Sequence, residues 1–317
     1  MTTLVTGGAG FIGSHLAASL LQRGEAVVIL DNFNDYYDPA LKRRNIAQLG
    51  APSHLQVIEG DIRDRELVRD IFRQHSISRV AHLAAMANVR VSVSNPHLYA
   101  DVNIMGSLNL MEAASIEGVS VFVQASTSSV YGITDQIPFI ETDTADRPLA
   151  AYPATKRAAE LLGHTYHNLH NMNFTALRFF NVYGPAGRPD MMPIRLMEAT
   201  QTNEKMYLFN NGDIHRDWTY IDDTIDGVVA ALERPLGYEL VNLGCGAPIS
   251  LKELVATIEA LSGCKINWEP IDTPASDPPI TYCNNEKARR LLDLNPKISV
   301  QEGLLRTWEW FKAWKAL

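Results

Sequence analysis

The 317-residue sequence has only three cysteines, and none of them form a C-x-x-C spacing. A disulfide framework or a cysteine zinc site is not expected, and we predict that Cys245, Cys264 and Cys283 are buried reduced thiols. No apolar run approaches the ~18 residues that a membrane span needs. The opening stretch, MTTLVTGGAGFIG, enters a strand pattern at once, so we expect no signal peptide and a cytoplasmic protein.

Positive charge is also scarce. Lys and Arg number 28 against 36 Asp and Glu, which gives a net charge of −8. This balance argues against nucleic acid or an anionic membrane as partner, although a few local arginines can still bind a small anion. The triad His164, His167 and His170 lacks supporting carboxylates or cysteines, so we expect no metal site there.

The first 180 residues alternate short apolar runs with amphipathic stretches. Alternating strands and helices predict an α/β fold, with a doubly wound, Rossmann-type parallel sheet covered by helices on both faces. After about residue 181 the rhythm changes to short strands and helices. We therefore predict a dinucleotide-binding domain over 1–180 and a smaller mixed α/β substrate-binding domain over 181–317, with some segments of the second returning to the first.

A glycine-rich turn stands between the first strand and the first helix. In TGGAGFIG, Gly7, Gly10 and Gly13 follow the spacing of a dinucleotide-binding loop. The first glycine permits the tight turn, the second lets a pyrophosphate approach the backbone, and the third allows close packing of helix on sheet. The helix N-terminus adds oriented N–H donors for the phosphates.

Asp31 ends the second predicted strand, 24 residues after Gly7 (31 − 7 = 24). This is close to the ~20 residues expected for the acid that binds the adenosine ribose. No Arg or Lys follows it directly, and a carboxylate there repels a 2′-phosphate. NAD is therefore favoured over NADP.

Two further patterns carry chemistry. Hydroxyl side chains follow the fifth predicted strand in ASTSSVYG, and AYPATK places Tyr152 and Lys156 one helical turn apart. Pro153 fits only if Tyr152 stands at the start of a helix. A lysine ammonium nearby favours the phenolate and so makes tyrosine a usable base.

Together with the glycine turn, these patterns resemble the extended short-chain dehydrogenase/reductase family over nearly the whole chain. The resemblance implies that Tyr152 takes a proton from a substrate hydroxyl while hydride leaves carbon for NAD. It implies that Lys156 also holds the nicotinamide ribose and that Thr127 hydrogen-bonds the reacting oxygen. The cofactor site that it implies comprises Gly7, Gly10, Phe11, Ile12, Gly13, Asp31, Asn32, Asp61, Ile62, Leu83, Ala84, Ala85, Asn103, Tyr152, Lys156 and Phe179.

Within this family, dehydratases and decarboxylases carry an acid in the hydroxyl run, whereas this chain has Ser128 and Ser129. That difference favours epimerisation, in which hydride returns to the other face of a transient ketone. Further stretches resemble nucleotide-sugar 4-epimerases: RFFNVYGP, GDIHRDWTYIDD and PASDPPITY. The substrate residues that they and their neighbours imply are Arg90, Ser128, Ser129, Asn181, Arg188, Arg195, Arg216 and Asp277.

The blocks DNFNDYYD and GRPDM are similar to those of UDP-glucuronate 4-epimerases, although Asn181 and Ala186 depart from the usual residues. A UDP-sugar, UDP-glucuronate first, is the implied substrate, and Arg188 is the candidate clamp for its carboxylate. A 4-epimerase of neutral UDP-hexoses and a silent NAD-binding protein are the alternatives. The resemblance also implies a homodimer that pairs helices near 97–117 and 153–169.

Overall fold

The computed structural model describes residues 1–273 and 278–316. A seven-stranded parallel sheet forms its centre, in the order β3-β2-β1-β4-β5-β6-β10. The strands are β1 (Thr2–Thr6), β2 (Ala26–Asp31), β3 (Leu55–Glu59), β4 (Arg79–His82), β5 (Val121–Thr127), β6 (Phe174–Phe179) and β10 (Tyr238–Leu243). The strand order reverses between β1 and β4, which is where open α/β sheets bind ligands.

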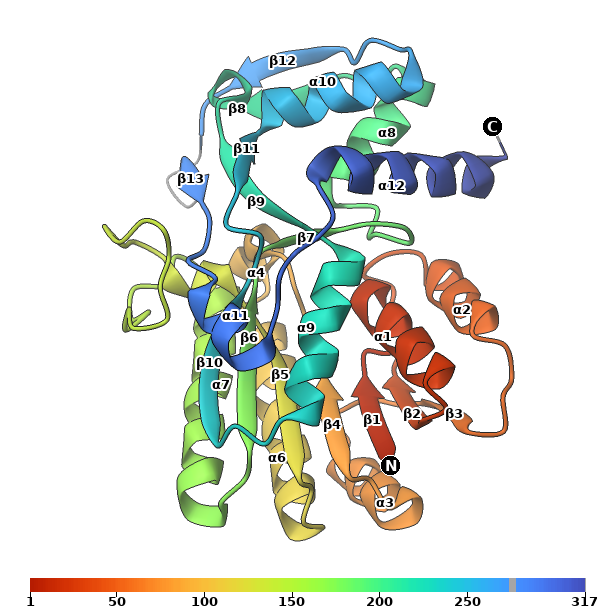
Figure 1. Cartoon of the computed structure of the whole chain (residues 1–317), viewed down its shortest axis with the longest axis vertical. Helices are drawn as coiled ribbons and strands as arrows, with labels where there is room; N and C mark the ends of the chain where they lie inside the picture. The colour runs from red at the N-terminus through yellow and green to blue at the C-terminus, as the bar shows by residue number, and fades with distance from the viewer. Residues whose placement is uncertain (274–277, 317) are drawn as a thin grey trace.

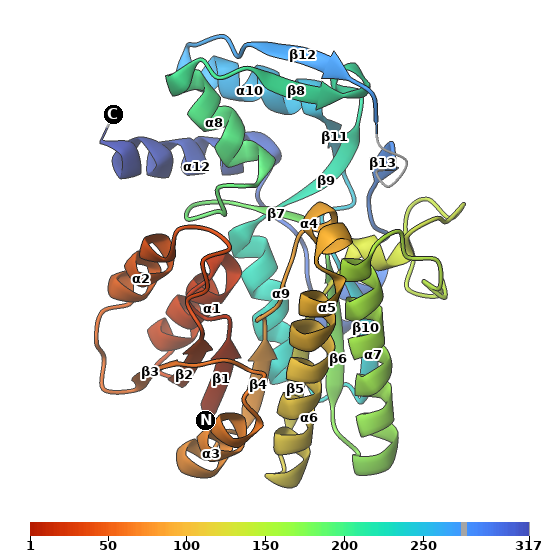
Figure 2. The ribbon, with the colours of Figure 1, turned by 180° about the vertical axis from the view of Figure 1, so that it is seen from behind.

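Helices cover both faces of this sheet (Figures 1 and 2). One layer contains α1 (Phe11–Gln22), α2 (Pro39–Gln48), α9 (Ile221–Glu233) and α11 (Glu286–Leu292). The other contains α3 (Arg65–His75), α5 (Pro96–Ala100), the π-helix η1 (Asp101–Gly106), α6 (Ser107–Ile116) and α7 (Ala151–His170). Neighbouring residues of β1 point to opposite faces of the sheet. Val5 belongs to the same buried cluster as Leu16 of α1, and Leu4 belongs to the same buried cluster as Phe72 of α3.

A smaller region lies beyond the carboxyl ends of the strands (Figure 1). Its first sheet joins β7 (Asn181–Tyr183), β9 (His215–Tyr220), β11 (Pro248–Ser250) and β13 (Ile280–Thr281). A second pairs β8 (Met206–Phe209) with β12 (Trp268–Ile271). The helices α8 (Met192–Thr202), α10 (Leu251–Ser262) and α12 (Val300–Lys315) pack around them.

Three short elements complete the structure. The helix α4 (Val89–Ser94) and the 3₁₀ turn η2 (Ser128–Tyr131) pack against α7, and the 3₁₀ turn η3 (Asn210–Gly212) packs against β8 and β12. The strand β10 belongs to the large sheet although it comes after residue 181, and α9 packs against α1. The chain therefore crosses between the regions more than once, while the boundary near 180 stays a prediction.

The doubly wound sheet expected from the sequence is confirmed. The expectation of three buried thiols is wrong for Cys264, which is exposed because it follows the helix-ending Gly263 in a surface turn; Cys245 is half-buried, Cys283 is buried, and all three are free. Across the described residues, no helix combines the length and apolarity needed to cross a bilayer.

Candidate active site

The glycine turn between β1 and α1 is packed so tightly that side chains do not fit. A Cβ atom on Gly13 would lie 2.2 Å from the Gly7 carbonyl oxygen, and one on Gly7, whose φ is +67°, would lie 2.7 Å from the Ala84 nitrogen. A Cβ on Gly10 would meet the Gly7 carbonyl oxygen at 3.2 Å. The bare backbone at the start of α1 is the surface that a pyrophosphate needs.

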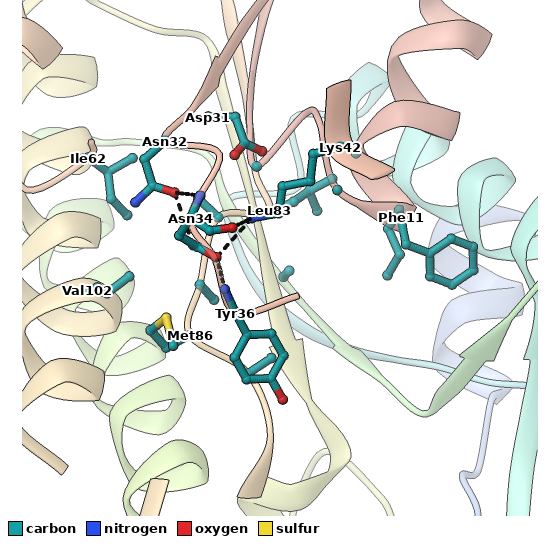
Figure 3. Close-up of a pocket in the computed structure, with 18 of the residues that line it drawn as sticks. Phe11, Asp31, Asn32, Asn34, Tyr36, Lys42, Ile62, Leu83, Met86 and Val102 are labelled. Carbon is teal, nitrogen blue, oxygen red and sulfur yellow. Dashed lines mark hydrogen bonds between the residues drawn. The ribbon is translucent and has the colours of Figure 1, made fainter. Parts of the chain in front are cut away.

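Next to this turn lie two carboxylates, Asp31 and Asp61. Asp31 ends β2 and accepts hydrogen bonds from the Ala9 and Phe33 amides at 3.0 and 2.9 Å. Asp61 accepts from Arg63 at 3.0 and 2.8 Å and from the Asn32 side chain at 3.0 Å. The Arg63 hydrogen bonds lower the pKa of Asp61 to about 2, so it is ionised at neutral pH. Figure 3 shows Asp31 and Asn32 among the side chains that line the neighbouring cavity.

A cavity of about 570 Å³ extends from the glycine turn and Asp31 along the carboxyl edge of the sheet. All but one of the predicted cofactor residues line it, including Leu83, Ala84 and Ala85 after β4 and Phe179 of β6. Asn103 is the exception. It is fully buried behind the wall, where its side chain accepts from the Met86 amide and donates to the Met86 carbonyl and to Thr155. Its place indicates that it supports the wall instead of touching a ligand.

Tyr152 and Lys156 reach the same cavity from the first two turns of α7. The helix begins at Ala151, so Pro153 costs no internal hydrogen bond, as the sequence predicts. Burial raises the pKa of Tyr152, while a hydrogen bond with Thr127 and the charge of Arg188 act in the opposite direction. The charge of Arg188 therefore favours the phenolate of Tyr152, which is the role that the sequence suggested for Lys156.

The Lys156 ammonium is buried, and within residues 1–273 and 278–316 it has no hydrogen-bond partner. Burial lowers the pKa of Lys156 to about 8, although the charge of Glu160 opposes this. A buried unpaired donor beside an open cavity fits the hydroxyl oxygens of a ribose. With the glycine turn and Asp31, this donor makes the cavity a match for NAD.

Glu160, which the sequence reading missed, fixes the helix that carries Tyr152 and Lys156. It is fully buried and receives Arg178 of β6 through two hydrogen bonds, at 3.0 and 2.8 Å. Ser126 of β5 donates to it at 2.6 Å. Burial opposes the ionisation of Glu160, but the Arg178 and Ser126 hydrogen bonds outweigh it and lower its pKa. Its position four residues after Lys156 was the available signal.

A second cavity of about 350 Å³ opens between the sheet and the smaller region. Four arginines line it: Arg90, Arg188, Arg195 and Arg216. Ser128 and Ser129 of η2 and Asn181 of β7 complete its wall, so every predicted substrate residue within the described ranges meets here. Asp277 lies outside the described residues. Among the described residues that line it, Asp190 is the one acidic side chain against four arginines, so the cavity suits an anionic ligand.

The individual arginines are held in different ways. The Arg90 guanidinium stacks on the Phe209 ring at 4.8 Å. Arg216 donates to the His215 carbonyl at 2.8 Å, and Arg195 lies 4.0 Å from the Met206 sulfur.

Arg188 lies at the boundary, because it lines both cavities. Its Nε and Nη2 atoms donate to Asp190 at 2.9 and 3.0 Å. Burial opposes the charge of Arg188, but the Asp190 hydrogen bonds prevail and its pKa is raised. Arg188 is therefore a permanent cation beside Tyr152, at the point where cofactor and second ligand would meet.

The three histidines on α7 have local partners. The His164 ring packs edge-on against Tyr238 at 4.9 Å, His167 hydrogen-bonds the Met172 carbonyl, and His170 packs against Tyr166. Within the part of the chain that the structure describes, no group of three or more His, Cys, Asp or Glu side chains is placed to hold a metal.

Comparisons with known proteins agree with this geometry. The model of the NAD dependent epimerase/dehydratase family matches residues 3–244. The chain is 44% identical over 310 residues to UDP-glucuronate 4-epimerase of Thermodesulfobacterium geofontis, covering 98% of this chain and 95% of that protein. It is 40% identical to UDP-glucuronate 4-epimerase 4 of Arabidopsis thaliana, covering 98% of this chain and 75% of that one.

Solved structures give the same result. UDP-glucuronic acid 4-epimerase of Bacillus cereus, in complex with UDP-glucuronic acid and NAD, superposes with a TM-score of 0.93 at 35% identity, covering 99% of this chain and 100% of that one. UDP-glucose 4-epimerase of Thermotoga maritima, with UDP-glucose, has a TM-score of 0.92 at 30% identity, covering 99% and 100%. The chain belongs to the NAD dependent epimerase/dehydratase family.

Proposed function

We propose that the protein is an NAD-dependent 4-epimerase that converts UDP-glucuronate to UDP-galacturonate through a transient 4-keto sugar. One observation carries this proposal: Arg188, a half-buried cation, stands beside Tyr152 where a cofactor cavity meets an arginine-lined cavity. The names of the similar proteins support it, since several of them are UDP-glucuronate 4-epimerases.

NAD bound in the larger cavity supplies a hydride acceptor and then a hydride donor. Tyr152 takes the proton from the C4 hydroxyl and later returns one to the ketone oxygen. Thr127, which hydrogen-bonds Tyr152, orients the phenol toward that oxygen. Lys156 would donate to the nicotinamide ribose. The charge of Arg188 favours the phenolate of Tyr152, and we expect the Lys156 ammonium to act in the same direction.

Asp31 sets the cofactor preference. Its two oxygens already accept hydrogen bonds from the Ala9 and Phe33 amides, which hold the carboxylate at the end of β2. Each oxygen keeps a lone pair for a ribose hydroxyl, whereas a 2′-phosphate would meet like charge. We infer that the other residues lining this part of the cavity contact NAD as the sequence predicts, with Asn103 acting through Met86.

In the second cavity, Arg90, Arg195 and Arg216 supply cations for the diphosphate and its nucleoside. Asn181 and the hydroxyls of Ser128 and Ser129 line the same wall nearer η2, where they can donate to the sugar. We also propose Asp277 for the nucleoside ribose, on the motif alone.

The sugar carboxylate poses a chemical problem for this reaction. Oxidation at C4 makes a β-keto acid, which loses CO₂ when the bond from C5 to the carboxylate stands perpendicular to the ketone plane. Arg188 is placed to hold the carboxylate in that plane, and Ser128 and Ser129 can assist. No acid stands in the run from Ser126 to Ser129 to remove the C5 proton.

A 4-epimerase of neutral UDP-hexoses is the second candidate, favoured by the likeness to the Thermotoga protein. Initial rates with UDP-glucuronate, UDP-glucose and UDP-N-acetylglucosamine separate the two. We expect kcat/KM for the uronate to exceed the others at least tenfold. A preference for either neutral sugar would replace the proposed substrate. No turnover of any of the three sugars would favour the alternative that the protein binds NAD without catalysing a reaction.

A homodimer remains our proposal for the assembly. Apolar side chains at least half exposed lie on η1, α6 and α7: Met105, Ile116, Leu161 and Leu169. Pairing this face with its copy would bury them. Light scattering should give twice 35.2 kDa, and a monomer at micromolar concentration would contradict the proposal. The cytoplasmic location stays a prediction.

A further inference from the structure

The loop between β2 and α2 is held rigidly by its own side chains. Lys42 of α2 donates to both the backbone and the side-chain oxygen of Asn34, at 2.9 Å each. The Asn34 amide and side chain donate to Asn32 at 3.2 and 3.0 Å, and the Tyr36 amide donates to Asn34 at 3.2 Å. Figure 3 shows these bonds and the Tyr36 ring projecting away from them. The loop that begins at Asp31 thus presents Tyr36 in one orientation.

The Tyr36 hydroxyl reaches the block that contains Arg188. It donates to the Asp190 carboxylate at 3.1 Å and accepts from the Asn88 side chain at 2.9 Å. Asp190 in turn binds Arg188 through two hydrogen bonds. Of the five side-chain donors of Arg188, those on Nη1 make no hydrogen bond within the described residues. The Asp190 pair therefore fixes the plane of the guanidinium and leaves one edge for a ligand.

Asn88 ties a third segment to this cluster. It stands before α4 at a φ of +98°, and its side-chain oxygen accepts from the Arg90 and Val91 amides. Tyr99 donates to the carbonyl oxygens of Ala87 and Asn88, and its ring packs edge-on against Tyr152 at 6.2 Å. The strained backbone is thus held from two sides, next to the reacting tyrosine.

We propose that Tyr36 and Asp190 are positioning residues that orient Arg188 toward the substrate carboxylate and so make the preference for a uronate depend on the cofactor loop. The inference rests on the proposed function. It explains why the blocks DNFNDYYD and GRPDM occur in one chain: each supplies half of the same hydrogen-bonded contact.

The ionisation of the cluster agrees with these roles. Burial raises the pKa of Tyr36, which keeps its hydroxyl a donor at neutral pH. Burial alone would raise the pKa of Asp190, but the hydrogen bonds from Arg188 outweigh it and lower that pKa. Tyr36 therefore donates to a carboxylate that is already charged, which makes its hydrogen bond stronger than a neutral one.

The test compares Tyr36→Phe, Asp190→Asn and the double variant with the wild-type holoenzyme, using UDP-glucuronate and UDP-glucose. Each single variant should raise KM for the uronate by about ten- to 140-fold, the range for losing a hydrogen bond to a charged group. KM for UDP-glucose and the bound NAD content should stay within twofold. Because both changes act on Arg188 through the same carboxylate, the double variant should lose no more than the larger single loss. The matched control is Tyr207→Phe, since Tyr207 is an exposed tyrosine of β8.

An equal rise in KM for both sugars would show that Tyr36 and Asp190 have general structural roles, and it would overturn the proposal. Unchanged preference in either single variant, or losses that multiply in the double variant, would overturn it as well. If the wild type fails to convert UDP-glucuronate, the proposed function falls and this inference with it. If the wild type converts UDP-glucuronate but the variants give one of these contradicting results, the proposed function stands and only the positioning roles are overturned.

Discussion

Lys156→Met should make the cofactor-free protein more stable at neutral pH while abolishing its function. The Lys156 ammonium is buried, and its Nζ atom has no hydrogen-bond partner within the described residues. Burial lowers its pKa from the ordinary 10.5 to about 8. Methionine has a similar length and no charge, so it removes the cost of burying a cation and keeps the packing.

The size of the effect follows from the pKa difference. At ~1.4 kcal/mol per tenfold change, the interval from 10.5 to about 8 corresponds to about 3 kcal/mol. The folded protein releases its proton first, so between pH 8 and 10.5 the unfolded chain binds more protons and stability rises with pH. The penalty is full below pH 8 and disappears as the pH passes 10.5.

Urea unfolding of protein stripped of cofactor measures this directly. At pH 7, the free energy of unfolding of Lys156→Met should be up to about 3 kcal/mol higher than that of the wild type, and this difference should shrink by pH 10.5. Lys252 is exposed, so Lys252→Met should have the same free energy of unfolding as the wild type at both pH values. Added NAD should stabilise the wild type far more than the variant. A variant no more stable at pH 7, or a gap that does not change with pH, would refute the reasoning.

Three further outcomes are expected. Tyr152→Phe should fold and bind nucleotide sugar but lose about 10²–10⁴-fold in kcat, because only the proton acceptor is removed; near-normal turnover in a steady-state assay would exclude Tyr152 as the base. Purified protein should carry NAD that is regenerated in each cycle, since Asp31 repels a 2′-phosphate; chromatography that finds NADP, or a need for added NAD in every turnover, would contradict this. Arg188→Ala should weaken UDP-glucuronate far more than UDP-glucose and release some UDP-pentose; a variant that keeps its preference without decarboxylation would remove Arg188 from the mechanism.

The sequence predicts the large sheet well because its signals are local. Each of the six predicted strands of the first region overlaps a strand of the structure, and the glycine turn lies directly after β1. The place of β10 is harder to predict, since nothing in its residues indicates that it returns to pair with β6. The short strands β11 and β13 depend on pairing with β9 across the fold and are equally hidden.

The site residues also divide into those with a local signal in the sequence and those that depend on the tertiary structure. Motifs at fixed spacing identify Gly7, Tyr152 and Lys156, because their function demands that spacing. The contact between Tyr36 and Asp190 joins residues 154 apart in the chain, and no spacing rule connects them. The spacing from Lys156 places Glu160 on the same helix face, but its role depends on Arg178 of a neighbouring strand, which that spacing does not indicate. The burial of Asn103 behind the cavity wall likewise needs the tertiary structure.

The most direct test of the account is the reaction of pure protein with UDP-glucuronate in D₂O, followed by NMR. Hydride taken from C4 and returned to the same carbon does not exchange with solvent, and the run from Ser126 to Ser129 contains no acid to remove the C5 proton. The account predicts UDP-galacturonate that keeps protium at both C4 and C5, with no added NAD and no UDP-pentose. Deuterium at C4, or the absence of the 4-epimer, would contradict it.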